Sequence, residues 1–166
     1  MENDLIQYIL EHRLHIDRDL ENFSNIIINS EGNVGAEKST KKMLMKSWYD
    51  GYLLSLYVGI KTNSRKRDYK QLEKAIRGWS SRKKQYLYLI SMLLAKPEVQ
   101  NELNLDSRQN LNNIPNLKSL SDSIKRVCDE YAFGGLQFLK EQYDKDDTIF
   151  EDVLAEKIKD LVSGAN

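Results

Sequence analysis

Apolar residues recur every three or four positions along most of this chain, which is the spacing of one face of an α-helix. The first such run includes Leu5, Ile9 and Phe23, and two glycines, at 32 and 35, follow it. Glycine is a strong helix breaker, so the run ends before them. The pattern therefore predicts one amphipathic helix over about residues 3–29.

The most apolar stretch predicts a central helix over about residues 40–61. Ser39 or Thr40 could cap its start, and apolar side chains cover most of its circumference, as in a helix buried on all sides. A row of small residues with a spacing of four runs along it: Gly51, Ser55 and Gly59. Since glycine inside a helix is unfavourable, we expect this row to be kept for the close approach of another helix.

Two segments after the central helix carry helix-start signals. Asp68 and Gln71 match a capping box, which predicts a short helix through Arg77. Ser81 is placed to cap a further helix that ends before Pro97, because the residue before proline is disfavoured in a helix. This region is therefore predicted to be two helices interrupted by the residues around Gly78.

The last third of the chain predicts one long helix and shorter ones beside it. Residues 97–116 are ambiguous: the segment from Pro97 could form one further short helix, and the asparagine-rich residues 106–116 favour a loop. Apolar positions from Leu117 to about Tyr143 predict the long helix, in which Gly134 and Gly135 mark a kink or a close crossing. A final helix opens with a capping box: Thr148 and Glu151.

Together these segments predict an all-α fold, a single-domain bundle of about five to six helices around the central helix. A chain of 166 residues suits one domain over 1–166. The start is acidic, without a signal-peptide pattern, and the most apolar window contains Lys46 and Asp50, so no membrane partner is expected. A single cysteine, Cys128, is typical of a reducing compartment, and we expect a cytoplasmic protein.

The net charge of zero hides a strong asymmetry along the chain. Residues 37–85 hold fourteen Lys and Arg and four Asp and Glu, a net charge of +10, while residues 1–36 and 86–166 each carry −5. A concentrated positive segment is typical of a surface that binds phosphate groups. The other interpretations are that these cations pair with the acidic flanks or with a second copy, or that they dock onto an acidic protein.

Two predicted helix starts within the basic segment have the unfavourable sign of charge. Lys41 and Lys42 follow one cap, and Arg82, Lys83 and Lys84 follow the other. A helix N-terminus is partially positive, so each cation there costs about 0.3 to 1 kcal/mol unless an anion binds. By contrast, Arg65, Lys66 and Arg67 follow a predicted helix C-terminus, where cations are favourable without any ligand.

These observations predict a non-catalytic accessory subunit that binds the phosphate backbone of DNA or RNA, with no cofactor. Tyr69 and Trp79 could add base stacking because they lie beside the helix interruptions. The alternative is a helical adaptor that acts only through a protein partner or a second copy. The predicted nucleic-acid-binding residues are Lys41, Lys42, Lys61, Arg65, Lys66, Arg67, Lys70, Arg77, Trp79, Arg82, Lys83 and Lys84.

Familiar catalytic and metal-binding patterns are absent, so no enzyme class is indicated. His12 and His15 are interpreted as polar positions on a solvated helix face, Cys128 as inert packing, and the acidic run at 144–147 as a helix-capping turn without a calcium loop's glycine. In size, helicity and basic middle segment the chain is similar to two groups of proteins. These are the helical small subunits of prokaryotic nucleic-acid-guided effector complexes and the small helical accessory proteins of bacterial DNA-modification and defence loci. Its abundant Lys, Asn and Ile favour a bacterial source.

Overall fold

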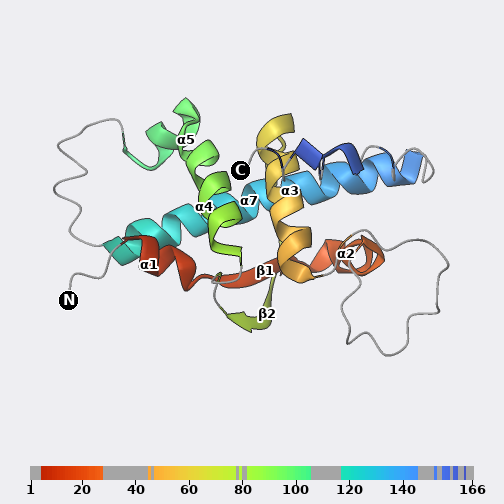
Figure 1. Ribbon diagram of the computed structural model, residues 1–166, viewed down its shortest axis with the longest axis horizontal. Coiled ribbons are helices and arrows are strands. Elements are labelled where there is room, and N and C mark those ends of the chain that lie inside the picture. The colour runs from red at the N-terminus through yellow and green to blue at the C-terminus, as the bar shows by residue number, and fades with distance from the viewer. Residues whose placement is uncertain are drawn as a thin grey trace.

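The computed structural model describes residues 5–27, 45, 47–77, 79, 82–105 and 117–145, with 152, 155–157, 159, 160 and 163; for residues 26 and 73–77 it describes the backbone. This part of the chain is mainly helical with one two-stranded sheet, which confirms the predicted fold class (Figure 1). The elements are α1 (Leu5–Leu10), β1 (Arg13–Asp17), the 3-10 helix η1 (Arg18–Leu20), α2 (Glu21–Ile27), α3 (Trp48–Thr62), β2 (Gln71–Arg77), α4 (Lys83–Leu94), α5 (Pro97–Glu102) and α7 (Leu117–Lys145).

Helix α3 is the predicted central helix, and every residue in 51–60 is buried. Its start differs from the expectation: Ser47 is the N-cap, its Oγ accepting from the backbone N of Asp50 at 3.2 Å. The cap predicted at Ser39 or Thr40 lies outside the described residues, and the helix begins eight residues later than expected. It ends at Thr62, where Asn63 adopts a left-handed conformation with φ of 53°.

The close helix crossing predicted from the small residues of α3 is confirmed, and α7 is the partner (Figure 1). A Cβ added to Gly59 would lie 1.9 Å from the carbonyl oxygen of Tyr131 in α7. A Cβ added to Gly135 of α7 would lie 1.9 Å from the carbonyl oxygen of Ser55. The two backbones therefore meet at a distance that only glycine permits at these positions.

The single N-terminal helix predicted over 3–29 is wrong, because α1 and α2 are separated by a strand. β1 pairs antiparallel with β2, with Asp17 opposite Gln71 and Arg13 opposite Arg77. The short helix predicted from Asp68 to Arg77 is wrong for the same reason. Both segments have apolar spacings that suit a helix or a strand, and their pairing with each other over more than fifty residues decides between the two.

The helices after β2 agree with the sequence pattern, except that Arg82 and not Ser81 is the N-cap of α4. α4 ends at Leu94, α5 begins with Pro97 at its first turn, and α7 runs for 29 residues to Lys145. In Figure 1, α7 extends along the bundle, α3 and α4 cross it, and β2 lies outside β1 at the edge. The loop predicted over 106–116 and the capping box at Thr148 and Glu151 lie outside the described residues.

No helix among the described residues is both long enough and apolar enough to cross a membrane.

Substituting Gly135→Ala should destabilise the fold by about 3 kcal/mol, because the new methyl group would overlap the backbone of α3 and cannot be accommodated by a side-chain rotation. Urea unfolding followed by circular dichroism measures this change. Lys118→Ala, at an exposed position of the same helix, serves as the control and should change stability by less than about 0.5 kcal/mol. Equal midpoints for the two variants would contradict the crossing.

Candidate nucleic-acid interface

Arg65, one of the predicted phosphate-binding residues, is held in an internal ion-pair network. Its guanidinium lies 2.6 Å from Glu130 and 2.7 Å from Glu102, and its side chain is only 13% exposed. Arg126 reaches the same two carboxylates at 2.7 and 2.8 Å. The hydrogen bonds from Arg65 and then from Arg126 lower the pKa of Glu102 to about 2. Arg65 therefore joins the 63–70 segment to α5 and α7 and is already neutralised.

Lys66 and Arg82 also have acidic partners within the fold. Lys66 pairs with Asp17, a fully buried carboxylate of β1. Arg82 donates to Asp50 at 2.9 Å, in the first turn of α3. Together with Arg65, these residues show that part of the positive charge of the basic segment is neutralised within the fold, largely by acidic residues of the flanks. This was one of the alternative interpretations of the sequence.

Trp79 is fully buried. Its ring stacks on Tyr86 with centroids 4.0 Å apart, packs edge-on with Tyr49 and packs against Tyr52 at a tilt of 52°. Tyr69, the other residue considered for base stacking, packs edge-on against Phe133. Protein side chains already occupy the ring faces of Trp79, so it is not part of the interface that we consider below.

The exposed cations of the basic segment lie at separate places on the molecule. Lys61 is in the last turn of α3, whereas Lys83 and Lys84 begin α4 beside the start of α3, to which Arg82 connects them. Arg67 and Lys70 follow α3, with side chains 70% and 72% exposed, and their nearest carboxylates are 3.7 Å away. Lys41 and Lys42 lie outside the described residues. The predicted residues whose side chains the structure describes are therefore spread over separate parts of the surface and the interior.

The β1–β2 pair brings a different set of cations together. At one end of the pair, Arg13 is opposite Arg77, and at the other end the backbone N of Arg18 donates to the carbonyl of Lys70 at 2.8 Å. The start of α4 lies beside the first end, because Trp79 donates from its backbone N to the Leu10 carbonyl at 2.9 Å. We call the following residues the basic ribbon: Arg13, Arg18, Lys70, Arg77, Lys83 and Lys84.

Sequence reasoning missed Arg13 and Arg18, because both fall in the acidic N-terminal flank. The alternation of Arg13, Leu14, His15 and Ile16 could have indicated a strand, since polar and apolar residues alternate there. In the structure Leu14 and Ile16 are buried and Arg13 is exposed, as that alternation requires. The helical spacing of the surrounding residues concealed this short signal.

A buried carboxylate, Asp129 of α7, lies beneath the ribbon and receives three donors from different elements. The Tyr52 hydroxyl donates at 2.7 Å, the His15 Nδ1 lies at 2.7 Å, and Lys125 completes the set. Burial alone would raise the pKa of Asp129, but the charge of Lys125 and the hydrogen bond from His15 outweigh it and lower that pKa. Asp129 therefore joins β1 to α3 and α7 as an ionised group.

His12 is buried between α4 and α7, so the interpretation of both histidines as residues of a solvated helix face is wrong. Its ring nitrogens lie 3.1 Å from the Tyr86 hydroxyl and 2.6 Å from the Ser121 hydroxyl. Burial, followed by the charge of Lys125, lowers the pKa of His12 to about 4. His12 is therefore neutral at ordinary pH.

Cys128 is fully buried, and burial raises the pKa of its thiol to about 12, which agrees with inert packing. Among the described residues, no group of three His, Cys, Asp or Glu side chains is placed to hold a metal ion. Of the acidic run at 144–147, Asp144 pairs with Lys140 at 2.5 Å, and positions 146 and 147 lie outside the described residues.

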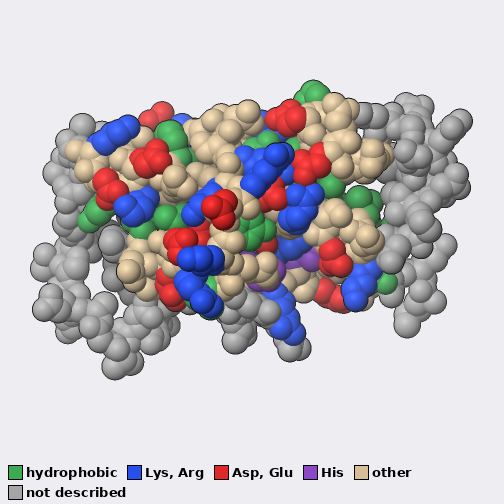
Figure 2. Space-filling view, turned by 180° about the vertical axis from the view of Figure 1, so that it is seen from behind, with side chains coloured by type: hydrophobic (Ala, Val, Ile, Leu, Met, Phe, Trp, Pro, Cys, Tyr) green, Lys and Arg blue, Asp and Glu red, His purple; other side chains and the backbone are tan. Residues whose placement is uncertain are grey.

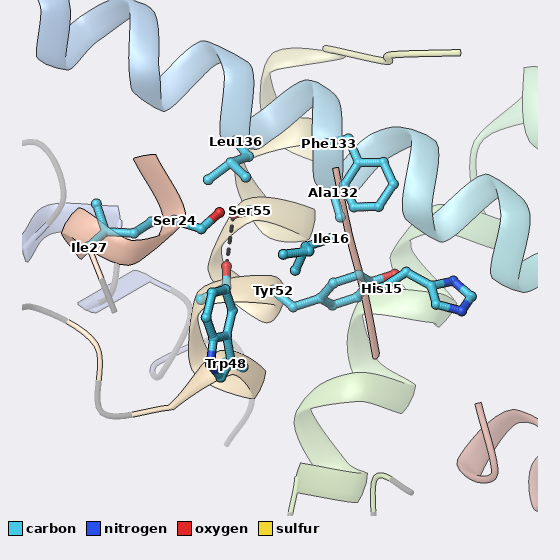
Figure 3. A pocket seen from close by; sticks show the side chains of 11 residues that line it. His15, Ile16, Ser24, Ile27, Trp48, Tyr52, Ser55, Ala132, Phe133 and Leu136 are labelled. Atoms are coloured by element: carbon cyan, nitrogen blue, oxygen red, sulfur yellow. Dashed lines mark hydrogen bonds between the residues drawn. The ribbon is translucent and has the colours of Figure 1, made fainter. Parts of the chain in front are cut away.

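A small apolar cavity lies between α2, α3, α7 and β1 (Figure 3). Its volume is about 20 Å³, which is room for about one water molecule and too little for an organic ligand. Ser55, on its wall, donates to the Gly51 carbonyl at 2.8 Å. Figure 3 shows the His15 ring directed away from the apolar side chains that line this cavity.

Comparison with known proteins gives no match: no family model, no curated protein and no solved structure is similar to this chain.

Arg65 and Arg67 approach the same two carboxylates but differ in burial, so they make a matched pair for a stability test. Arg65→Met should lower the free energy of unfolding by about 3 kcal/mol, because Glu130 would stay buried with one cation fewer. Arg67→Met should change it by less than about 1 kcal/mol, since Arg67 is exposed and its contacts are long. Denaturant unfolding of both variants measures this, and similar losses would contradict the network.

The buried His12 should make stability depend on pH between about 6.5 and 4. The unfolded chain takes up a proton on His12 near pH 6.5, and the folded chain only near pH 4, so the unfolded state binds more protons in between. The free energy of unfolding should therefore fall by about 3 kcal/mol as the pH decreases through this window.

Urea unfolding at a series of pH values, for the wild type and His12→Gln, measures this loss. The variant should show a flatter profile between pH 6.5 and 4, and an unchanged slope would contradict the assignment to His12. Glu102 contributes in a lower pH window: its pKa is about 2 in the folded chain and ordinarily 4.5, so its contribution to stability is lost below pH 4.5.

Proposed function

We propose that this chain is an accessory subunit that binds the phosphate backbone of a nucleic acid through the basic ribbon. The observation that carries the proposal is the pairing of β1 with β2, which gathers cations at both ends of one antiparallel pair. β2 lies at the outside of the bundle, with β1 between it and the helices (Figure 1). A ligand can therefore approach the pair without displacing the core.

The dimensions of the ribbon suit a nucleic acid. β1 has five residues, which at about 3.3 Å per residue gives a ribbon about 15 Å long, and an irregularity in the pairing accommodates the seven residues of β2 within the same length. The major groove of a duplex admits a two-stranded ribbon, and a single strand can lie along one. Cations at the ends of the ribbon would contact phosphates without reading bases, so we expect binding to depend on charge more than on sequence.

The start of α4 adds a second source of attraction for phosphate. Lys83 and Lys84 are exposed in its first turn, which contains no acidic residue, and the N-cap residue Arg82 makes no side-chain capping bond. Cations at this position oppose the helix dipole, and a bound phosphate would remove that cost. Of the two basic helix starts considered from the sequence, this is the one that lies among the described residues, and it supports the proposal.

A protein partner, or a second copy of the chain, is the second candidate. The observation that favours it is the face shown in Figure 2, where Lys and Arg side chains alternate with Asp and Glu over the surface. Among the more exposed groups, Arg67 and Arg126 both lie within 3.7 Å of Glu102, so both signs of charge occur within a short distance. A face of mixed sign suits another protein better than a polyanion.

Three further points stay proposals that rest on the sequence pattern. A cytoplasmic location is supported by the free thiol of Cys128. A non-catalytic role is supported by the lack of familiar catalytic motifs, and a bacterial source by the residue composition.

Replacing Lys83 and Lys84 together by Gln should weaken binding to labelled single-stranded and duplex oligonucleotides by about tenfold or more at low salt. The slope of log affinity against log salt concentration should fall by about two, because two phosphate contacts are lost. Fluorescence anisotropy over about 50 to 200 mM salt measures both quantities.

The control is the double variant Lys61→Gln and Lys145→Gln, which removes the same charge from exposed positions outside the ribbon. It should keep the wild-type slope. If the two double variants behave alike, the ribbon is not the interface. If the wild type binds no oligonucleotide at low salt, the proposal fails, and sedimentation at low and high salt would then test self-association.

A further inference from the structure

His15 lies between the two basic ends of the ribbon. It is the third residue of β1, two residues after Arg13 and three before Arg18, and its Cα is opposite Glu73 of β2. Its side chain is 15% exposed, more than that of His12, the other histidine of the chain. Figure 2 shows histidine side chains at the surface beside Lys and Arg side chains. An imidazole is therefore accessible where the proposed ligand would lie.

The hydrogen bonds of His15 determine which ring nitrogen can accept. The carboxylate of Asp129, 2.7 Å from Nδ1, is an acceptor only, so Nδ1 must carry the proton. In the neutral ring, Nε2 then holds the lone pair. The side-chain amide of Gln71 lies 3.0 Å from Nε2, the position for an amide N–H that donates to it. Lys125 Nζ also lies 3.3 Å from Nδ1, but it is much closer to Asp129 and donates there. Asp129 and Gln71 therefore favour one tautomer, with the acceptor at the outer nitrogen.

The acceptor at Nε2 can be reached by a ligand, because its present partner is a surface side chain. Gln71 is exposed and lies in the first position of β2. Its amide can rotate into water at little cost, and a ligand donor can take its place. Asp129, Tyr52 and Lys125 would remain in position beneath, so the ring would keep its orientation.

A hydrogen-bond acceptor on this surface requires a ligand that offers a hydrogen-bond donor as well as phosphates. Phosphate oxygens only accept hydrogen bonds, so they cannot satisfy a lone pair on Nε2. The backbone of DNA contains no hydrogen-bond donor. The backbone of RNA contains one in each nucleotide, the 2′-hydroxyl.

We propose that His15 accepts a hydrogen bond from a ribose 2′-hydroxyl through Nε2, so that the nucleic acid bound by the ribbon is RNA. This inference rests on the proposed function and adds its substrate class. In this arrangement the cations at the ends of the ribbon hold phosphates, and the imidazole between them contacts the sugar. Asp129 is a positioning residue, because it fixes the tautomer and the direction of the ring.

The experiment compares three labelled single strands of one sequence: RNA, RNA with 2′-fluoro in place of each 2′-hydroxyl, and DNA. The 2′-fluoro strand has nearly the size of RNA but lacks the donor. The wild type should bind RNA at least about fivefold more tightly than the 2′-fluoro strand, the ratio expected for one hydrogen bond. Because this comparison uses unaltered protein, it does not depend on the folding of a variant.

His15→Asn should remove the preference. An asparagine amide can still donate to Asp129, as Nδ1 does, but it has no group at the position of Nε2. The variant should bind RNA and the 2′-fluoro strand equally, with the affinity for the 2′-fluoro strand unchanged. Gln71→Ala should keep or increase the preference, because it uncovers Nε2.

The possible outcomes separate this inference from the proposed function. Equal binding of all three strands by the wild type would overturn the role of His15 and leave backbone binding in place. A preference for RNA that persists in His15→Asn would also overturn it. Failure of every strand to bind at low salt would overturn the proposed function and the inference together.

Discussion

The structure depends on the close crossing of α3 and α7. Gly59 and Gly135 allow the two backbones to touch, and a side chain at either position would force them apart. The crossing brings the buried face of α3 against the middle of the longest helix, and α1, α4 and β1 pack against this pair. Glycine is unfavourable inside an isolated helix, but at these positions it is required for the two helices to pack this closely.

The polar interior follows from the same crossing. Because α3 and α7 are so close, Tyr52 of α3 reaches Asp129 of α7, and β1 places His15 against the same carboxylate. A buried charge of this kind is tolerated only when it is paired and hydrogen-bonded, and here three donors satisfy it. The cluster thus joins the ribbon to the helices, and it also orients the imidazole that we propose as an RNA contact.

The zero net charge of the chain has a structural explanation in part. Arg65, Lys66 and Arg82 are matched to individual carboxylates, and two of those carboxylates, Asp17 and Glu130, are buried. Exposed cations such as Arg67 and Lys70 gain little from the carboxylates 3.7 Å away, because an ion pair at the surface contributes at most about 1 kcal/mol in water. The net charge therefore does not indicate how charge is distributed over the surface. The positions of individual side chains determine which ligands can bind.

Local patterns in the sequence were enough to predict the helical fold class, the buried central helix, the long helix from Leu117 and the contact at the small residues of α3. These features depend on local periodicity and on residue size, which are properties of consecutive residues. The strands at residues 13–17 and 71–77, the neutralised Arg65 and Lys66, and the buried His12 could not be predicted in this way. Each depends on a partner far away in the chain: Gln71 opposite Asp17, Glu130 beside Arg65, and Ser121 beside His12.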